Sequence, residues 1–124
     1  MQIRSSAEDY LETILLLSKR IGAVRSIDIV DEMGFSKPSV SVAMKKLREK
    51  ELIYMDEEGY IKLTEKGESA AEQVYERHSV LCGWLVNIGV NLKQAEEDAC
   101  RMEHILSRET FLAIKKMYEE SLNA

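Results

Sequence analysis

Proline, cysteine, histidine and aromatic residues are scarce in this sequence. Its 124 residues include one proline, two cysteines and two histidines, and 6% are aromatic. A single proline combined with 45% hydrophobic residues excludes a disordered or low-complexity chain. No apolar run approaches membrane-spanning length, and residues 1–6 lack the apolar core of a signal peptide. We therefore expect a cytoplasmic protein in which Cys82 and Cys100 stay reduced and able to bind metal.

Motifs of catalysis are also missing. The sequence has no glycine-rich phosphate loop, no nucleophile elbow and no paired catalytic constellation, so an enzyme is not expected. A net charge of −5 argues against a protein that coats nucleic acid without specificity. Basic residues are nevertheless concentrated in residues 37–50, which contain five of them and a single acid, Glu49. This segment predicts a local contact with an anionic partner, although a solvated helix face would look similar.

The basic segment forms the second half of a helix-turn-helix pattern. Apolar spacing predicts helices over about residues 26–33 and 37–50, with Gly34 as the left-handed stop between them. The second helix of such a pair enters the major groove of DNA, where its first residues meet base edges and its lysines meet phosphates. The residues expected to contact DNA are Ser36, Lys37, Pro38, Ser39, Ser41, Val42, Lys45 and Lys46.

A predicted β-hairpin follows this helix directly. Residues 52–55 and 60–63 read as two short strands joined by the acidic turn Asp56-Glu57-Glu58-Gly59. A recognition helix followed by a hairpin is typical of a winged helix-turn-helix, and another helix is predicted over about residues 6–19. Phosphates would repel the acidic turn, so we expect the strands rather than the tip to lie closer to DNA.

Three further helices are predicted after the hairpin. The first runs over about residues 65–87, and the second is capped by Asn91 and carries Cys100, Glu103 and His104. The third begins at Ser107. A helical tail behind a DNA-binding domain commonly forms a dimer, because palindromic operators require readers with two-fold symmetry.

Potential metal ligands are distributed over three of the predicted helices. Cys100, Glu103 and His104 stand at i, i+3 and i+4, which places a thiolate, a carboxylate and an imidazole on one helix face. Charged pairs at this spacing also decorate ordinary solvated helices, and a lone histidine is more often packed than ligating. The candidates considered together are Asp9, Glu12, His78, Cys100, Glu103 and His104.

These residues also carry a family resemblance. The segments Glu8-Asp9-Tyr10-Leu11-Glu12, 26–64, Arg77-His78, Ile88-Gly89-Val90 and Ala99-Cys100-Arg101-Met102-Glu103-His104 resemble the diphtheria-toxin-repressor family of metal-dependent transcriptional repressors. The likeness is strongest to the short manganese-regulator branch, which lacks a C-terminal SH3-like domain. It implies a mainly α fold, with a winged helix-turn-helix domain over residues 1–66 and a helical metal-binding and dimerisation domain over residues 67–124.

The resemblance assigns the ligands residue by residue. Asp9, Glu12 and His78 match the manganese branch, and Glu103 and His104 match ligands of both the manganese and the iron-responsive branches. Cys100 agrees with the iron-responsive branch, whereas the manganese branch has a bridging glutamate there. A thiolate is softer than a carboxylate and favours iron, cobalt or zinc over manganese. The expected cofactor is Mn²⁺ or Fe²⁺, with Co²⁺ or Zn²⁺ able to bind in vitro.

The function that the resemblance implies is a homodimeric, metal-activated repressor. It would bind palindromic double-stranded operator DNA and control manganese or iron homeostasis. One alternative is a winged-helix regulator that senses a small organic ligand or, through Cys100, thiol oxidation. Another is an interaction module in which the basic helix binds an acidic protein.

Overall fold

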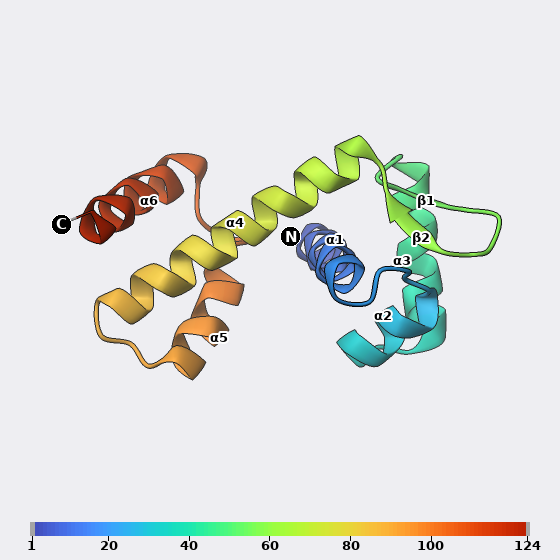
Figure 1. Cartoon of the computed structure of the whole chain (residues 1–124), viewed down its shortest axis with the longest axis horizontal. Coiled ribbons are helices and arrows are strands. Elements are labelled where there is room, and N and C mark those ends of the chain that lie inside the picture. Colours follow the sequence, from blue (N-terminus) through green and yellow to red (C-terminus); the bar gives the residue numbers. More distant parts are fainter. Residues whose placement is uncertain (1, 124) are drawn as a thin grey trace. The chain divides into compact units, whose positions relative to one another are not determined.

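The computed structural model describes residues 2–123 and divides into two compact units, residues 1–73 and 74–124 (Figure 1). Helix α4 (Glu65–Asn87) passes through the division, so its residues 65–73 belong to the first unit and its residues 74–87 to the second. None of the helices in the described part of the chain combines the length and the apolar character needed to cross a membrane.

The first unit begins with three helices, α1 (Gln2–Ile21), α2 (Ser26–Met33) and α3 (Lys37–Glu49). Gly34 ends α2 in the left-handed region at φ 73°, and its N–H donates to the Val30 carbonyl at 2.9 Å. Ser36 caps α3, because its Oγ accepts from the Ser39 N–H at 3.3 Å. The predicted helix-turn-helix is therefore confirmed.

Helix α1 is longer than the predicted residues 6–19 and extends beyond them at both ends. The apolar stripe that predicted it covers only the buried part, from Tyr10 to Leu17. Once a helix is nucleated by packing, each added residue gains a hydrogen bond at little cost, so its ends can run past the stripe.

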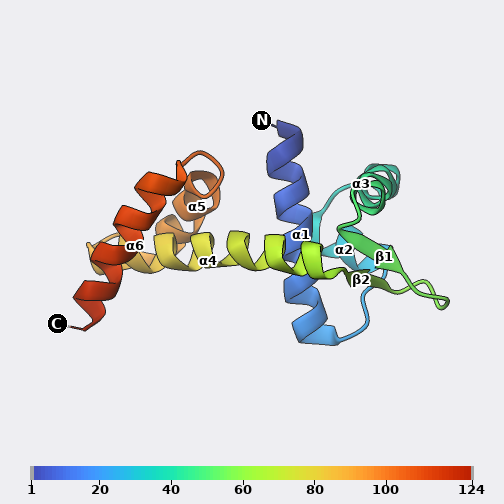
Figure 2. The same cartoon turned by 90° about the horizontal axis from the view of Figure 1, so that it is seen from above.

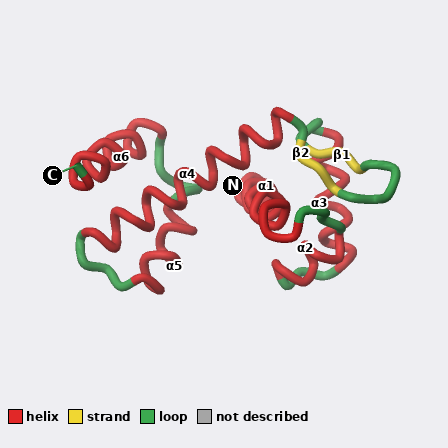
Figure 3. The backbone as a smooth tube through the Cα atoms, viewed as in Figure 1, coloured by secondary structure: helices red, strands yellow, loops and turns green. Residues whose placement is uncertain are grey.

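A two-stranded antiparallel hairpin follows α3, as predicted. Strand β1 (Ile53–Met55) pairs with β2 (Ile61–Leu63), with Ile53 opposite Leu63 and Met55 opposite Ile61. The Ile61 N–H also donates to the Val24 carbonyl at 2.7 Å, which ties the hairpin to the loop after α1. Figure 3 shows these strands in yellow, beside the helix-turn-helix.

The core of the first unit is formed by the inward faces of all these elements. Ile14 of α1, Ile29 of α2, Val40 of α3 and Ile61 of β2 are each at most 2% exposed. Met44 and Leu47 lie one and two turns beyond Val40 and are buried with it. This apolar stripe fixes the rotation of α3 and turns its other face to solvent.

The second unit contains the rest of α4 together with α5 (Leu92–Met102) and α6 (Arg108–Leu122), which Figure 2 shows from above. Asn91 caps α5 by accepting from the Gln94 N–H at 3.0 Å, and Ser107 caps α6 by accepting from the Thr110 N–H at 3.1 Å. The core joins one buried residue from each helix: Leu81, Ala99 and Phe111.

The prediction that Glu103 and His104 lie on the helix after Asn91 is wrong at its end. Helix α5 ends at Met102, Glu103 is its C-terminal capping residue, and His104 lies in the following turn. A short turn replaces the last part of the predicted helix and leads to Ser107, the cap of α6. Glu103 and His104 are therefore presented by a turn rather than by a helix face.

Candidate functional site

The exposed face of α3 is the candidate nucleic-acid interface. All eight residues predicted to contact DNA are exposed, whereas the Val40, Met44 and Leu47 stripe is buried beneath them. A hydrogen bond of 2.9 Å from Ser36 Oγ to Ser39 Oγ orders the hydroxyls at the start of the helix. Basic and small polar side chains on one accessible helix suit contacts with phosphates and base edges.

The hairpin holds its acidic turn in place through Asp56. Asp56 Oδ1 accepts from the backbone N–H groups of Glu58 at 3.0 Å and Tyr60 at 2.9 Å. The outward side of the strands carries Tyr54 opposite Lys62, both exposed. The Arg25 guanidinium lies 4.3 Å from the centre of the Tyr60 ring. Asp56 is thus a structural residue of the turn, and the strands present an aromatic and a basic side chain.

Within the second unit, three of the six predicted metal ligands come together. His78 Nδ1 lies 3.1 Å from Glu103 Oε2, and His104 Nε2 lies 3.3 Å from Glu103 Oε1. His78 comes from the middle of α4, whereas Glu103 and His104 come from the turn after α5. Residues 25 positions apart in the chain thus meet at one carboxylate.

The Glu103 side chain fits a cation at this point. Glu103 is only 2% exposed and is the one polar or charged residue among the buried residues that the structure describes. Its Oε1 atom lacks a hydrogen bond of good geometry from any described group, although His104 Nε2 is close. A buried carboxylate without full compensation is costly. Carboxylate and imidazole are also donors that manganese, iron, cobalt and zinc accept.

Arg77 binds the backbone next to this cluster. Its Nη1 donates to the carbonyl oxygens of Glu103 and Leu106, both at 3.1 Å, and its guanidinium lies 5.1 Å from the Phe111 ring centre. Both carbonyls belong to the connection between α5 and α6, so Arg77 fixes the turn that carries Glu103. In the sequence, Arg77 belongs to the Arg77-His78 pair that carries part of the family resemblance, without a role of its own. The signal that could have identified it is a cation one position before a candidate ligand.

The two cysteines differ in environment. Cys82 packs against the core of the second unit, and burial, with a smaller contribution from the negative charge of Glu96, raises the pKa of its thiol. A thiol that stays protonated at neutral pH is a poor metal ligand. Cys100 is exposed on α5, one turn before Glu103. Cys100 is therefore the better candidate of the two cysteines for a metal-binding thiolate.

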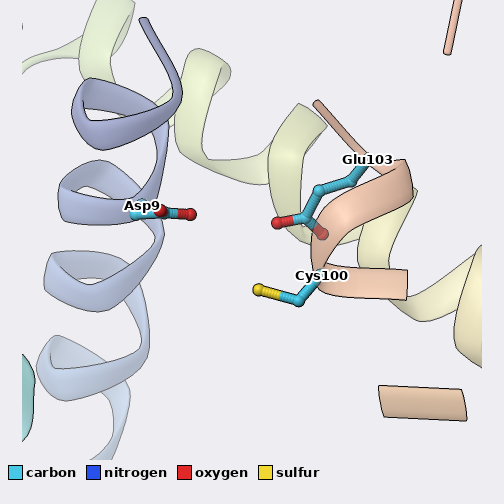
Figure 4. A group of neighbouring side chains, drawn as sticks. All are labelled: Asp9, Cys100 and Glu103. Carbon is cyan, nitrogen blue, oxygen red and sulfur yellow. The ribbon is translucent and has the colours of Figure 1, made fainter. Parts of the chain in front are cut away.

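Asp9 and Glu12 belong to the first unit. Both lie on α1, at i and i+3, and both are half-buried. Figure 4 shows Asp9 projecting from α1, and Cys100 and Glu103 projecting from α5 and the residue that follows it. The predicted set thus divides into two carboxylates on α1 and four donors in the second unit: His78, Cys100, Glu103 and His104.

Two family models match the chain and together cover nearly all of it. The N-terminal DNA-binding domain of the iron-dependent repressors matches residues 2–68. Their metal-binding and dimerisation domain matches residues 64–121. The predicted order of a winged-helix domain and a helical metal-binding domain is thereby confirmed.

Curated relatives agree with the family models. The transcriptional regulator MntR of Escherichia coli O6:H1 is 35% identical over 112 residues, which cover 90% of this chain and 72% of that relative. The HTH-type transcriptional regulator MntR of Listeria welshimeri is 39% identical over 103 residues, which cover 82% of this chain and 72% of the relative.

Solved structures share the fold. The manganese regulator SloR superposes with a TM-score of 0.76 at 30% identity, covering 94% of this chain. A manganese-dependent transcriptional repressor in complex with manganese superposes with a TM-score of 0.83 at 27% identity, covering 91% of this chain. This chain spans about half of each, 53% of SloR and 52% of the repressor.

Both halves of the chain thus match one family, whose members are transcriptional regulators rather than enzymes. The chain belongs to the iron-dependent repressor family of metal-dependent transcriptional regulators.

Proposed function

We propose that this chain is a cytoplasmic, homodimeric repressor that binds palindromic operator DNA when loaded with Mn²⁺ or Fe²⁺ and so controls manganese or iron homeostasis. The observation that carries the proposal is the buried Glu103 carboxylate between His78 and His104, with one oxygen short of a hydrogen-bond donor. The exposed basic face of α3 supports the binding of operator DNA. We also propose the division into domains at residues 66 and 67.

The metal ligands in this proposal are Asp9, Glu12, His78, Cys100, Glu103 and His104. A bound divalent cation supplies the positive charge that offsets repulsion among the three carboxylates. Asp9 and Glu12 would bind the cation from α1, which belongs to the same unit as the helix-turn-helix. The other four donors would bind it from the helical domain. Ordering these two halves positions the recognition helices of a dimer for successive half-sites. A coupling of roughly 1–3 kcal/mol between metal and DNA is sufficient, since it changes affinity about 5–150-fold.

Metal identity is tested by an anaerobic titration of a labelled operator with Mn²⁺, Fe²⁺, Co²⁺ and Zn²⁺. We expect Cys100→Glu to shift activation toward Mn²⁺ relative to Co²⁺ and Zn²⁺, because a hard carboxylate replaces a soft thiolate. An unchanged order of metals would show that Asp9 and Glu12 set the preference instead. Operator affinity that responds neither to chelation nor to added metal would contradict the proposal. Loss of binding on diamide treatment, without metal dependence, would favour a thiol sensor.

Phosphate contact by α3 is tested with Lys45→Ala. Lys45 is exposed, so the variant should fold normally and lose only charge. We expect weaker operator binding and a salt dependence reduced by about 0.9 in log–log slope for each lysine removed, or about two per dimer. Lys66→Ala, at an exposed position of α4, provides a control for lost positive charge. An intact slope in Lys45→Ala would reject α3 as the element that contacts phosphates.

A further inference from the structure

Val42 is an apolar residue in an unusual position on α3. Val42 is 55% exposed, whereas Val40 and Met44, two residues away on either side, are 0% and 3% exposed. Packing therefore does not account for a valine at position 42. Helix propensity does not account for it either, because β-branched residues lose rotamer freedom in a helix and alanine would be favoured.

The neighbours of Val42 place it at the centre of the proposed DNA-binding face. Ser39 precedes it by one helical turn, and Lys45 and Lys46 follow it by one turn, all of them exposed. Side chains at these spacings share a face of the helix. Lysines that hold phosphates on this face bring Val42 toward the floor of the major groove, where the base edges lie.

The rest of α3 limits how this helix can read bases. Residues Lys37–Glu49 contain neither asparagine nor glutamine, the side chains that bind adenine in a bidentate manner. Arginine and lysine bind guanine, so Arg48 and the lysines of α3 do not recognise an A·T pair. The C5-methyl group of thymine is the apolar group that base pairs present in the major groove. An exposed valine complements that methyl group.

We propose that Val42 contacts the C5-methyl group of one thymine in each operator half-site and is the residue of α3 that distinguishes A·T from G·C there. This inference rests on the proposed function, because it requires that α3 enters the major groove of operator DNA. It adds a chemical basis for recognition of the operator sequence, namely an apolar contact with a base in place of a bidentate hydrogen bond. The operator is therefore expected to carry a thymine at one fixed position of each half-site.

Replacing thymine by deoxyuridine removes only this methyl group and tests the contact. The probe is the duplex that the wild-type protein selects from a random-sequence library with Mn²⁺ or, under anaerobic conditions, with Fe²⁺. Each thymine is then replaced in turn, in both half-sites, and affinity is measured by fluorescence anisotropy. Burying one methyl group is worth about fourfold in affinity, so the symmetric replacement at the contacted position should weaken wild-type binding about fifteenfold.

The variant Val42→Ala should lose most of the deoxyuridine effect, because it lacks the two γ-methyl groups that reach furthest from the helix. Val42 is exposed, so this variant should fold like the wild type, which circular dichroism will verify. Ile21→Ala is the matched control: Ile21 is 47% exposed at the end of α1 and should leave the deoxyuridine effect unchanged.

The possible failures are distinguishable. If the wild-type protein binds its selected operator but no deoxyuridine position weakens binding, the Val42 inference is overturned and the proposed function stands. The same holds if Val42→Ala keeps the full deoxyuridine effect. If the wild-type protein selects no duplex with Mn²⁺ and none with Fe²⁺ under anaerobic conditions, the proposed function is overturned and this inference with it.

Discussion

Glu103→Gln is expected to abolish metal-activated operator binding. The substitution preserves the size of the side chain but removes the charge that faces His78 and His104 at 3.1 and 3.3 Å. Changes in groups that merely support a metal ligand already cost about 10–100-fold in metal affinity. Loss of a ligand carboxylate should therefore weaken Mn²⁺ binding by more than about 100-fold, as measured by calorimetry and by anisotropy with labelled operator.

The stability of the same variant separates a lost ligand from a damaged fold. Burying an incompletely compensated carboxylate is costly, so Glu103→Gln in chelator should be at least as stable as the wild type. Metal at 100 times its Kd should raise the unfolding free energy of the wild type by about 2.7 kcal/mol, and this gain should disappear in the variant. Thermal melts with and without Mn²⁺ measure both quantities.

Glu97→Gln is the matched control for this experiment, because Glu97 is an exposed acid on the same helix, α5. It removes one negative charge without touching the cluster and should leave metal affinity unchanged. Equal effects of the two substitutions would mean that only net charge matters. Retention of metal-dependent stability by Glu103→Gln would exclude Glu103 as a ligand.

Gly67→Ala is expected to destabilise the first unit. Gly67 lies in the first turn of α4, and a Cβ atom there would overlap the carbonyl group of Leu52. That carbonyl accepts from the Thr64 N–H at 3.1 Å, and Thr64 Oγ1 donates to the Glu51 carbonyl at 2.7 Å. These bonds prevent the backbone from moving aside easily. Overpacking that forces the backbone to shift costs about 1–3 kcal/mol and occasionally more.

Urea denaturation provides the measurement for Gly67→Ala. Ser69→Ala, at an exposed position of the same helix, controls for the general effect of alanine on α4 and should be neutral. DNA binding by Gly67→Ala should fall with the folded fraction, since the hairpin and α3 share one core. If the urea midpoint of Gly67→Ala equals that of Ser69→Ala, the junction of the hairpin and α4 accommodates the extra methyl group without loss of stability.

Much of the fold could be predicted from local signals. Gly34, Ser36, Asn91 and Ser107 mark helix boundaries through their own backbone preferences and side-chain oxygens, and the structure uses each of them in that way. The i, i+4, i+7 spacing of Val40, Met44 and Leu47 indicates a helix face, and that face of α3 is buried. These signals are reliable because they act within a few residues of the chain.

The candidate site could be predicted in its chemistry but not in its geometry. The residue types and the family resemblance identified His78, Glu103 and His104 as donors. They could not show that the helix ends at Met102 or that Arg77 binds the carbonyl of Glu103, because both depend on packing of α5 against α4 and α6. Burial of Glu103 and the incomplete bonding of its Oε1 are likewise properties of the folded unit.

The sequence by itself determined the order of the elements, the positions of their caps and the types of donor atoms available. Periodicity and capping are encoded over a few residues, so they do not require knowledge of the fold. Only the tertiary structure decided that Glu103 is buried between two histidines, that Gly67 has no room for a side chain and that Val42 is exposed among lysines. Those features arise where distant segments meet or fail to meet, and side-chain packing rather than local propensity sets them.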